Sequence, residues 1–247
     1  MNPEVIIGYI LSALAALIVL TVHEYSHAFA AYKLGDNTAR NLGRLTLNPL
    51  KHIDVFGAIC MIFFHFGWAK PVPINARNFK KPKRDFAITA LAGPLSNLIM
   101  AFISAFIYLL CYSFVKDIAF ESQFLFNLVS YSLQFIYIFH IINVGIAVFN
   151  LLPVPPLDGS RILNVVLPPK AYFGIMRYER YIYFGLIAWL LLGGYVANVF
   201  LSIPFISGNG VLAFIASLFD LSGRLSDLFQ LISNAMISFW QLIPFLR

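Results

Sequence analysis

Charged side chains are scarce in this sequence of 247 residues, in which Asp, Glu, Lys and Arg together make up 11%. Soluble domains typically contain about 25% charged residues, because their surfaces must be solvated. Hydrophobic residues here make up 60%, and the mean hydropathy is +0.80. The composition therefore excludes an ordinary soluble protein and indicates a chain that lies in a lipid bilayer.

Cysteine is rare, with Cys60 and Cys111 both lying in apolar sequence. Neither belongs to a CxxC pair, so nothing indicates a thiolate metal site or a redox motif. The net charge is +6, but the basic residues are concentrated in loops between hydrophobic segments. This distribution favours a membrane topology signal, and no nucleic-acid partner is expected.

Long hydrophobic runs are abundant, at residues 5–34, 86–114, 124–152, 181–200, 203–219 and 225–246. A helix of about 20 apolar residues crosses a bilayer, where the backbone must satisfy its own hydrogen bonds. No basic residue precedes the first run, which predicts a retained span and not a cleaved signal. We therefore expect an all-α polytopic membrane protein with about six hydrophobic helices.

Two shorter elements are predicted after the first helix. Residues 44–47 alternate polar and apolar side chains before Asn48-Pro49, a pattern typical of a short strand and a turn. Residues 55–68 are apolar but too few to cross, which favours a re-entrant or interfacial segment. A small β element and a re-entrant segment are thus expected beside helix 1.

The positions of Lys and Arg predict the orientation in the membrane. Ten of the 17 fall between Lys33 and Arg84, Lys116 alone lies in the next loop, and four more fall within residues 161–180. Loops rich in Lys and Arg stay on the cytoplasmic side. Residues 34–85 and 153–180 are therefore expected in the cytoplasm, with the N-terminus outside.

The first hydrophobic run contains His23-Glu24-Tyr25-Ser26-His27, which matches the pattern HExxH. Histidines four residues apart lie on one helical face, so both rings can bind a single zinc ion, and the glutamate is suited to act as a general base. Ionisable groups at this depth in a span are costly to desolvate, which makes them candidates for function.

A catalytic zinc normally has three protein ligands and an open position for water, so a third ligand is required. Asp158 is the best candidate, in the stretch Asn150-Leu151-Leu152-Pro153-Val154-Pro155-Pro156-Leu157-Asp158-Gly159. Its prolines end the third helix, and the glycine permits a turn directly after the carboxylate. Because this helix returns to the cytoplasmic side, the aspartate is expected on the same face as His23 and His27.

An HExxH helix followed by NxxPxPxxDG resembles the site-2 protease family of intramembrane zinc metalloproteases. Further stretches at residues 43–49, 68–73 and 92–97 resemble its compact bacterial branch, which lacks PDZ and CBS domains. The resemblance covers residues 1 to about 170, as an intramembrane metalloprotease core of three catalytic helices. Residues 171–247 are expected to add membrane helices to the same domain.

The resemblance implies one zinc ion per chain, held by His23, His27 and Asp158, with Glu24 as the catalytic base. Single-pass or short membrane proteins would be the substrates, and a bacterial inner or plasma membrane the location. Asn150 is a candidate for binding the substrate backbone; the alternative is a helix cap or a bridge between helices. Asn97 is expected to bond across helices near the site and not to touch the metal.

Two other functions fit parts of this pattern. A divalent-metal transporter would use the same three ligands as a transport site, although few polar groups line a path to the opposite face. A catalytically silent relative would bind membrane peptides without cutting them. The intact glutamate at position 24 argues against silence, because its loss is the simplest route to an inactive protein.

Overall fold

The computed structural model describes residues 3–54, 56–57, 69–203, 207–218 and 220–246. Helix predominates in these ranges, and four helices are long and apolar enough to cross a membrane: α1 (Pro3–Lys33), α4 (Pro82–Val115), α5 (Gln123–Leu151) and α8 (Glu179–Leu201). They coincide with four of the hydrophobic runs. The expected all-α membrane architecture is confirmed at this level.

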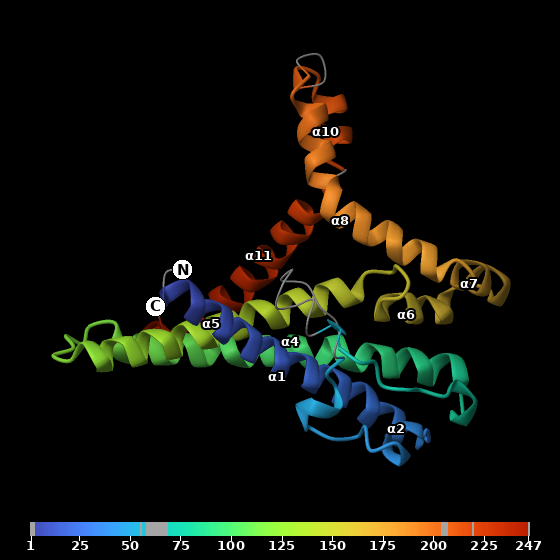
Figure 1. The fold of residues 1–247 in the computed structure, drawn as a ribbon, viewed down its shortest axis with the longest axis horizontal. Helices are drawn as coiled ribbons and strands as arrows, with labels where there is room; N and C mark the ends of the chain where they lie inside the picture. Colours follow the sequence, from blue (N-terminus) through green and yellow to red (C-terminus); the bar gives the residue numbers. More distant parts are fainter. Residues whose placement is uncertain (1–2, 55, 58–68, 204–206, 219, 247) are drawn as a thin grey trace.

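The helices α1, α4 and α5 form the body of the molecule. The last two run as a long pair, and α1 packs against both (Figure 1). Small side chains are buried in this body, since Ala15, Ala101 and Ala105 are almost completely buried. Residues of this size let helix backbones approach closely in a membrane, where burial against lipid gives little driving force.

The C-terminal part follows α5 through α6 (Asp158–Val166) and α7 (Pro169–Met176). Figure 1 shows α8 leading away from the α4–α5 pair toward α10 (Gly210–Ser217), and α11 (Leu221–Trp240) returning to the pair. With eight residues, α10 is too short to cross. The helix α11, which contains Arg224, Asp227 and several uncharged polar residues, is not among the helices apolar enough to cross. The described ranges thus support four of the six expected membrane helices.

Polar contacts fasten α11 to the body. The two ring nitrogens of His140, on α5, lie 2.9 Å from the Ala101 carbonyl oxygen and 2.8 Å from Ser233 Oγ. Trp240 Nε1 donates to the carbonyl oxygen of Phe102 at 2.9 Å. These bonds connect α11 to both α4 and α5.

The prediction of a strand at residues 44–47 is wrong. The described ranges contain no strand, only an isolated antiparallel bridge between Ile53 and Ala69. Side chains, and not a neighbouring strand, bond the backbone in this region: Arg44 donates to the Lys70 carbonyl at 2.6 Å, and His52 Nε2 lies 2.8 Å from the Thr46 carbonyl. The predicted re-entrant segment 55–68 lies, apart from residues 56 and 57, outside the described residues.

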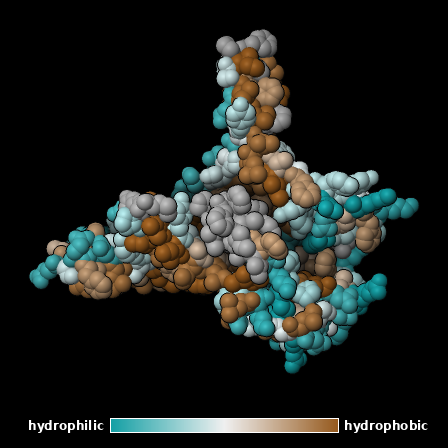
Figure 2. Space-filling model, viewed as in Figure 1, coloured by the Kyte–Doolittle hydropathy of each residue, from teal (hydrophilic) through white to brown (hydrophobic). Residues whose placement is uncertain are grey.

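Hydrophilic residues gather at the two ends of the helical body. Figure 2 shows them around α2 (Thr38–Asn41) and α7 on one side and at the turn between α4 and α5 on the other. Hydrophobic residues cover much of the surface between. This distribution suits helices that cross a bilayer and end in water.

Asp36 organises the loop that follows α1. Its carboxylate accepts hydrogen bonds from the Asn75 amide and the Asn78 side chain, both at 2.7 Å, and from the amide and hydroxyl of Thr38. Burial raises the pKa of Asp36, but the hydrogen bonds outweigh it and hold the pKa below its ordinary value of 3.8. The ionised carboxylate therefore joins the end of α1 to the segment before α4.

Replacing Asp36 by Asn should lower the free energy of unfolding by about 1–3 kcal/mol at neutral pH, because an amide cannot accept all of these bonds. A group with a depressed folded pKa stabilises above its unfolded pKa and loses that contribution as the pH falls through the folded value. As the pH is lowered below about 4, the stability of the wild type should therefore fall more than that of the variant, and the difference between the two should shrink.

Thermal unfolding in detergent between pH 3 and pH 7 measures both effects. The matched control is Asp117→Asn, at an exposed position in the turn between α4 and α5. Equal stability of Asp36→Asn and the wild type at pH 7 would contradict the assignment.

Candidate metal centre

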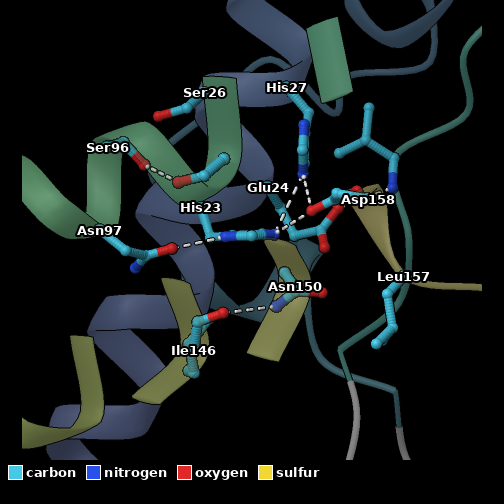
Figure 3. A network of polar contacts seen from close by, with 12 residues as sticks. His23, Glu24, Ser26, His27, Ser96, Asn97, Ile146, Asn150, Leu157 and Asp158 are labelled. Atoms are coloured by element: carbon cyan, nitrogen blue, oxygen red, sulfur yellow. Dashed lines mark hydrogen bonds and ion pairs between the residues drawn. The ribbon is translucent and has the colours of Figure 1, made fainter. Parts of the chain in front are cut away.

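His23 and His27 face each other from successive turns of α1. Their Nε2 atoms are 3.0 Å apart, and each residue is 4% exposed (Figure 3). The four-residue spacing places both rings on one helical side, as the HExxH pattern predicts. The pair therefore forms one half of a buried site within the α1–α4–α5 body.

Asp158 completes the cluster from more than a hundred residues away. It is the first residue of α6, and its Oδ2 lies 3.2 Å from Nε2 of both histidines. A Cβ atom at Gly159 would lie 2.3 Å from the Leu151 carbonyl oxygen, so only glycine lets the chain turn this tightly after α5. The structure thus brings the three predicted ligand residues together.

Hydrogen bonds on the far side of the rings fix which nitrogen faces the cluster. His27 Nδ1 lies 2.7 Å from the carbonyl oxygen of Thr89, and His23 Nδ1 lies 2.6 Å from Asn97 Oδ1. A carbonyl oxygen only accepts, so Nδ1 of His27 must carry a proton. In the neutral ring the Nε2 lone pair then points into the cluster. Asn97 bonds across helices, as predicted, and is not one of the three clustered groups.

The chemistry of this donor set fits a metal ion. Two imidazole nitrogens and a carboxylate oxygen converge within 3.2 Å, and Asp158 Oδ2 is buried without a hydrogen-bond partner. Burial raises the pKa of Asp158, but the two nearby imidazoles lower it well below its usual range, so the carboxylate is ionised. Zinc–nitrogen bonds of about 2.0–2.1 Å in a tetrahedron separate ligand atoms by about 3.3 Å, close to the observed spacing.

Glu24 stands next to the cluster without joining it. Its Oε2 accepts a hydrogen bond from the Val72 amide at 2.8 Å. The segment around Val72 is held in turn by the Arg44 guanidinium and by the bond from the Lys70 amide to the His52 carbonyl, at 2.8 Å. The sequence singled out this glutamate, but it gave no signal that the Val72 amide would hold it.

Gly93 on α4 packs directly against the two rings. A Cβ atom there would lie 2.4 Å from His27 Nε2 and 2.7 Å from His23 Cε1. The next residue, Pro94, removes the helical bond to the Ala90 carbonyl, and the carbonyl just before it, that of Thr89, binds His27. Gly93 thus makes room for the rings, a role that sequence reasoning missed.

The cluster opens into a cavity of about 1600 Å³ between α1, α5, α6 and α8. Its walls are mostly apolar, and Glu24 and Asn150 line it close to the histidines. Asn150 Nδ2 donates to the Ile146 carbonyl oxygen at 3.0 Å (Figure 3). Arg161 and Glu179, which also line the cavity, form an ion pair of 2.6 Å that joins α6 to α8.

Three convergent donors, a neighbouring carboxylate and an apolar cavity among membrane helices define the class of membrane-embedded metallopeptidases. The chain belongs to peptidase family M50, the site-2 protease family, whose family model matches residues 11–193. The resemblance found in the two motifs is thereby confirmed. Membership makes the chain a zinc metalloprotease.

Individual relatives agree with this assignment. The "Putative zinc metalloprotease YwhC" of Bacillus subtilis is 42% identical over 179 residues, which cover 71% of this chain and 76% of the relative. The "Putative zinc metalloprotease Rip2" of Mycolicibacterium smegmatis is 30% identical over 68% of this chain and 62% of the relative. No solved structure matches the chain.

The contact of Gly93 with both rings predicts that Gly93→Ala disrupts metal binding. The added methyl group would overlap the rings and push their nitrogens apart, while alanine itself favours the helix. We expect the purified variant to fold but to contain far less than one equivalent of zinc by elemental analysis. The control is Gly185→Ala on α8, where a Cβ atom meets nothing within 4 Å. Full zinc content in Gly93→Ala would contradict the proposed packing.

Proposed function

We propose that His23, His27 and Asp158 hold the catalytic zinc ion of an intramembrane endopeptidase, with Glu24 as its general base. The observation that carries the proposal is the convergence of three ligand atoms within 3.2 Å of one another in a buried site. Neighbouring acceptors hold the Nδ1 atoms of both rings, which leaves Nε2 for the metal. A bound zinc ion would polarise the scissile carbonyl and acidify the attacking water.

Glu24 is proposed to accept the proton of that water and to return it to the leaving amine. The glutamate follows His23 directly and lines the same cavity. Its bond to the Val72 amide holds the carboxylate in one orientation at the cavity wall. A base fixed in this way needs little reorganisation when the substrate arrives.

The substrates are proposed to be membrane-spanning segments of single-pass or short membrane proteins. Along α1, the cavity extends from Ile6 to His27, about 30 Å at 1.5 Å per helical residue. A largely apolar wall over this length suits a hydrophobic peptide that enters from the bilayer. Asn150 faces the same space, and its amide has a second N–H and a carbonyl oxygen with which to bind an unwound backbone.

The proposed setting is a bacterial plasma membrane, with the N-terminus outside and the metal centre near the cytoplasmic side. The Lys and Arg distribution supports this orientation. We also infer that residues 171–247 belong to one domain with the core of residues 1–170. Tyr183, Leu186, Ile187 and Leu190 of α8 support this inference, because they line the same cavity as the histidines.

Replacing Glu24 by Gln should reduce proteolysis by about 10²- to 10⁴-fold, the usual contribution of general acid–base catalysis, while zinc stays bound. Fragments of membrane proteins, compared by mass spectrometry between cells carrying wild type and Glu24→Gln, measure the activity. Elemental analysis of both purified proteins measures the metal.

Controls separate this function from its alternatives. His23→Ala should lose both zinc and activity, because it removes a ligand. A transporter would tolerate Glu24→Gln in a zinc-uptake assay, and a silent peptide binder would yield the same fragments with either protein. Undiminished cleavage by Glu24→Gln would refute the proposed mechanism.

A further inference from the structure

Two asparagines connect His23 to the backbone of a distant helix. Asn97 Oδ1, on α4, lies 2.6 Å from His23 Nδ1. Asn97 Nδ2 donates to Asn143 Oδ1 on α5 at 2.9 Å, and Asn143 Nδ2 donates to the Phe139 carbonyl oxygen at 2.8 Å. Both asparagines are completely buried, so water does not compete for these bonds.

The bonds can run in only one direction, because the last acceptor is a backbone carbonyl. The Phe139 oxygen cannot donate, so the NH₂ group of Asn143 must face it and its oxygen must face Asn97. That oxygen needs a donor, which turns the NH₂ group of Asn97 toward α5 and its oxygen toward α1. Nδ1 of His23 must therefore carry the proton.

We propose that Asn97 and Asn143 are positioning residues that hold His23 in the Nδ1–H tautomer, so that its Nε2 lone pair faces the metal. This inference rests on the proposed metal centre. His27 obtains the same tautomer directly from the Thr89 carbonyl, whose direction cannot change. His23 depends instead on two side-chain amides, each of which could flip if its neighbour were lost.

The amide chain also joins the three helices that form the site. His23, Asn97 and Asn143 come from α1, α4 and α5, and each bond crosses between two of these helices. In a membrane interior, an amide that loses its partner is left unsatisfied, which makes the complete chain favourable. Mutation of the residue that hydrogen-bonds the outer nitrogen of a metal-binding histidine typically lowers metal affinity by about 10- to 100-fold.

Paired substitutions at Asn97 and Asn143 test whether the direction of the hydrogen bonds between these amides and His23 matters. Asn97→Leu and Asn143→Leu keep similar volume but remove every hydrogen bond. Asn97→Asp and Asn143→Asp retain an accepting oxygen and, when protonated, an O–H that replaces the lost N–H. We expect cobalt(II) affinity, measured by absorption titration of the detergent-solubilised proteins, to fall about 10- to 100-fold in the Leu variants. The Asp variants should bind almost as tightly as the wild type.

His140→Leu is the control for loss of a buried polar side chain. It lies one turn from Asn143 on α5, is equally buried, and bonds to Ala101 and Ser233 away from the metal centre. Its stability should fall while its cobalt affinity stays unchanged. Equal cobalt binding by the Leu variants and the wild type would overturn the proposal, as would equal weakening of the Leu and Asp variants.

Tautomers provide a readout that does not require metal or activity. Long-range ¹H–¹⁵N NMR of histidine-labelled, metal-free protein should give a protonated Nδ1 for His23 in the wild type and both Asp variants. Protonation at Nε2 of His23 in the wild type would overturn the positioning role even if a Leu variant failed to fold. Failure of the wild type to bind cobalt, with the Nδ1–H tautomer present, would instead count against the proposed metal centre.

Discussion

The structure depends on three electron-pair donors that face one another inside a membrane protein. When both rings are neutral and protonated on Nδ1, Nε2 of His23, Nε2 of His27 and Oδ2 of Asp158 all face one another as acceptors, with no proton between them. Such a cluster is unfavourable without a cation, because buried lone pairs and a buried carboxylate repel one another. The surrounding helices must therefore hold the groups together against this repulsion until a positive charge stabilises them.

The α4 helix provides much of that restraint. Gly93 leaves room for the two rings, the Thr89 carbonyl holds one of them, and Asn97 holds the other. These three groups lie within nine residues around Pro94, where the helix lacks a backbone bond. One short stretch of α4 thus contacts both histidine rings of the proposed metal centre.

Sequence reasoning predicts the features that follow from local spacing. The HExxH period places two histidines on one side of α1, and the proline-rich end of α5 places Asp158 near them. Sequence reasoning fails where contacts between residues far apart in the chain depend on individual side chains. Residues 44–47 alternate like a strand, yet the Arg44 side chain bonds the Lys70 carbonyl and no strand forms. The pairing of Asn97 with Asn143 is equally invisible in sequence, because it depends on the packing of α4 against α5.

The few charged residues of the chain support the site from outside its apolar core. Asp36 bonds Asn75, and Arg44 bonds the Lys70 carbonyl, so polar contacts fix both ends of the short segment between them. Val72 lies in that segment, and its amide holds Glu24. The proposed metal ligands are positioned by helices, whereas the carboxylate of Glu24, the proposed general base, is bonded by a loop. Because Glu24 itself lies on α1 and its carboxylate is held by this loop, its position and its orientation are set by two different parts of the chain.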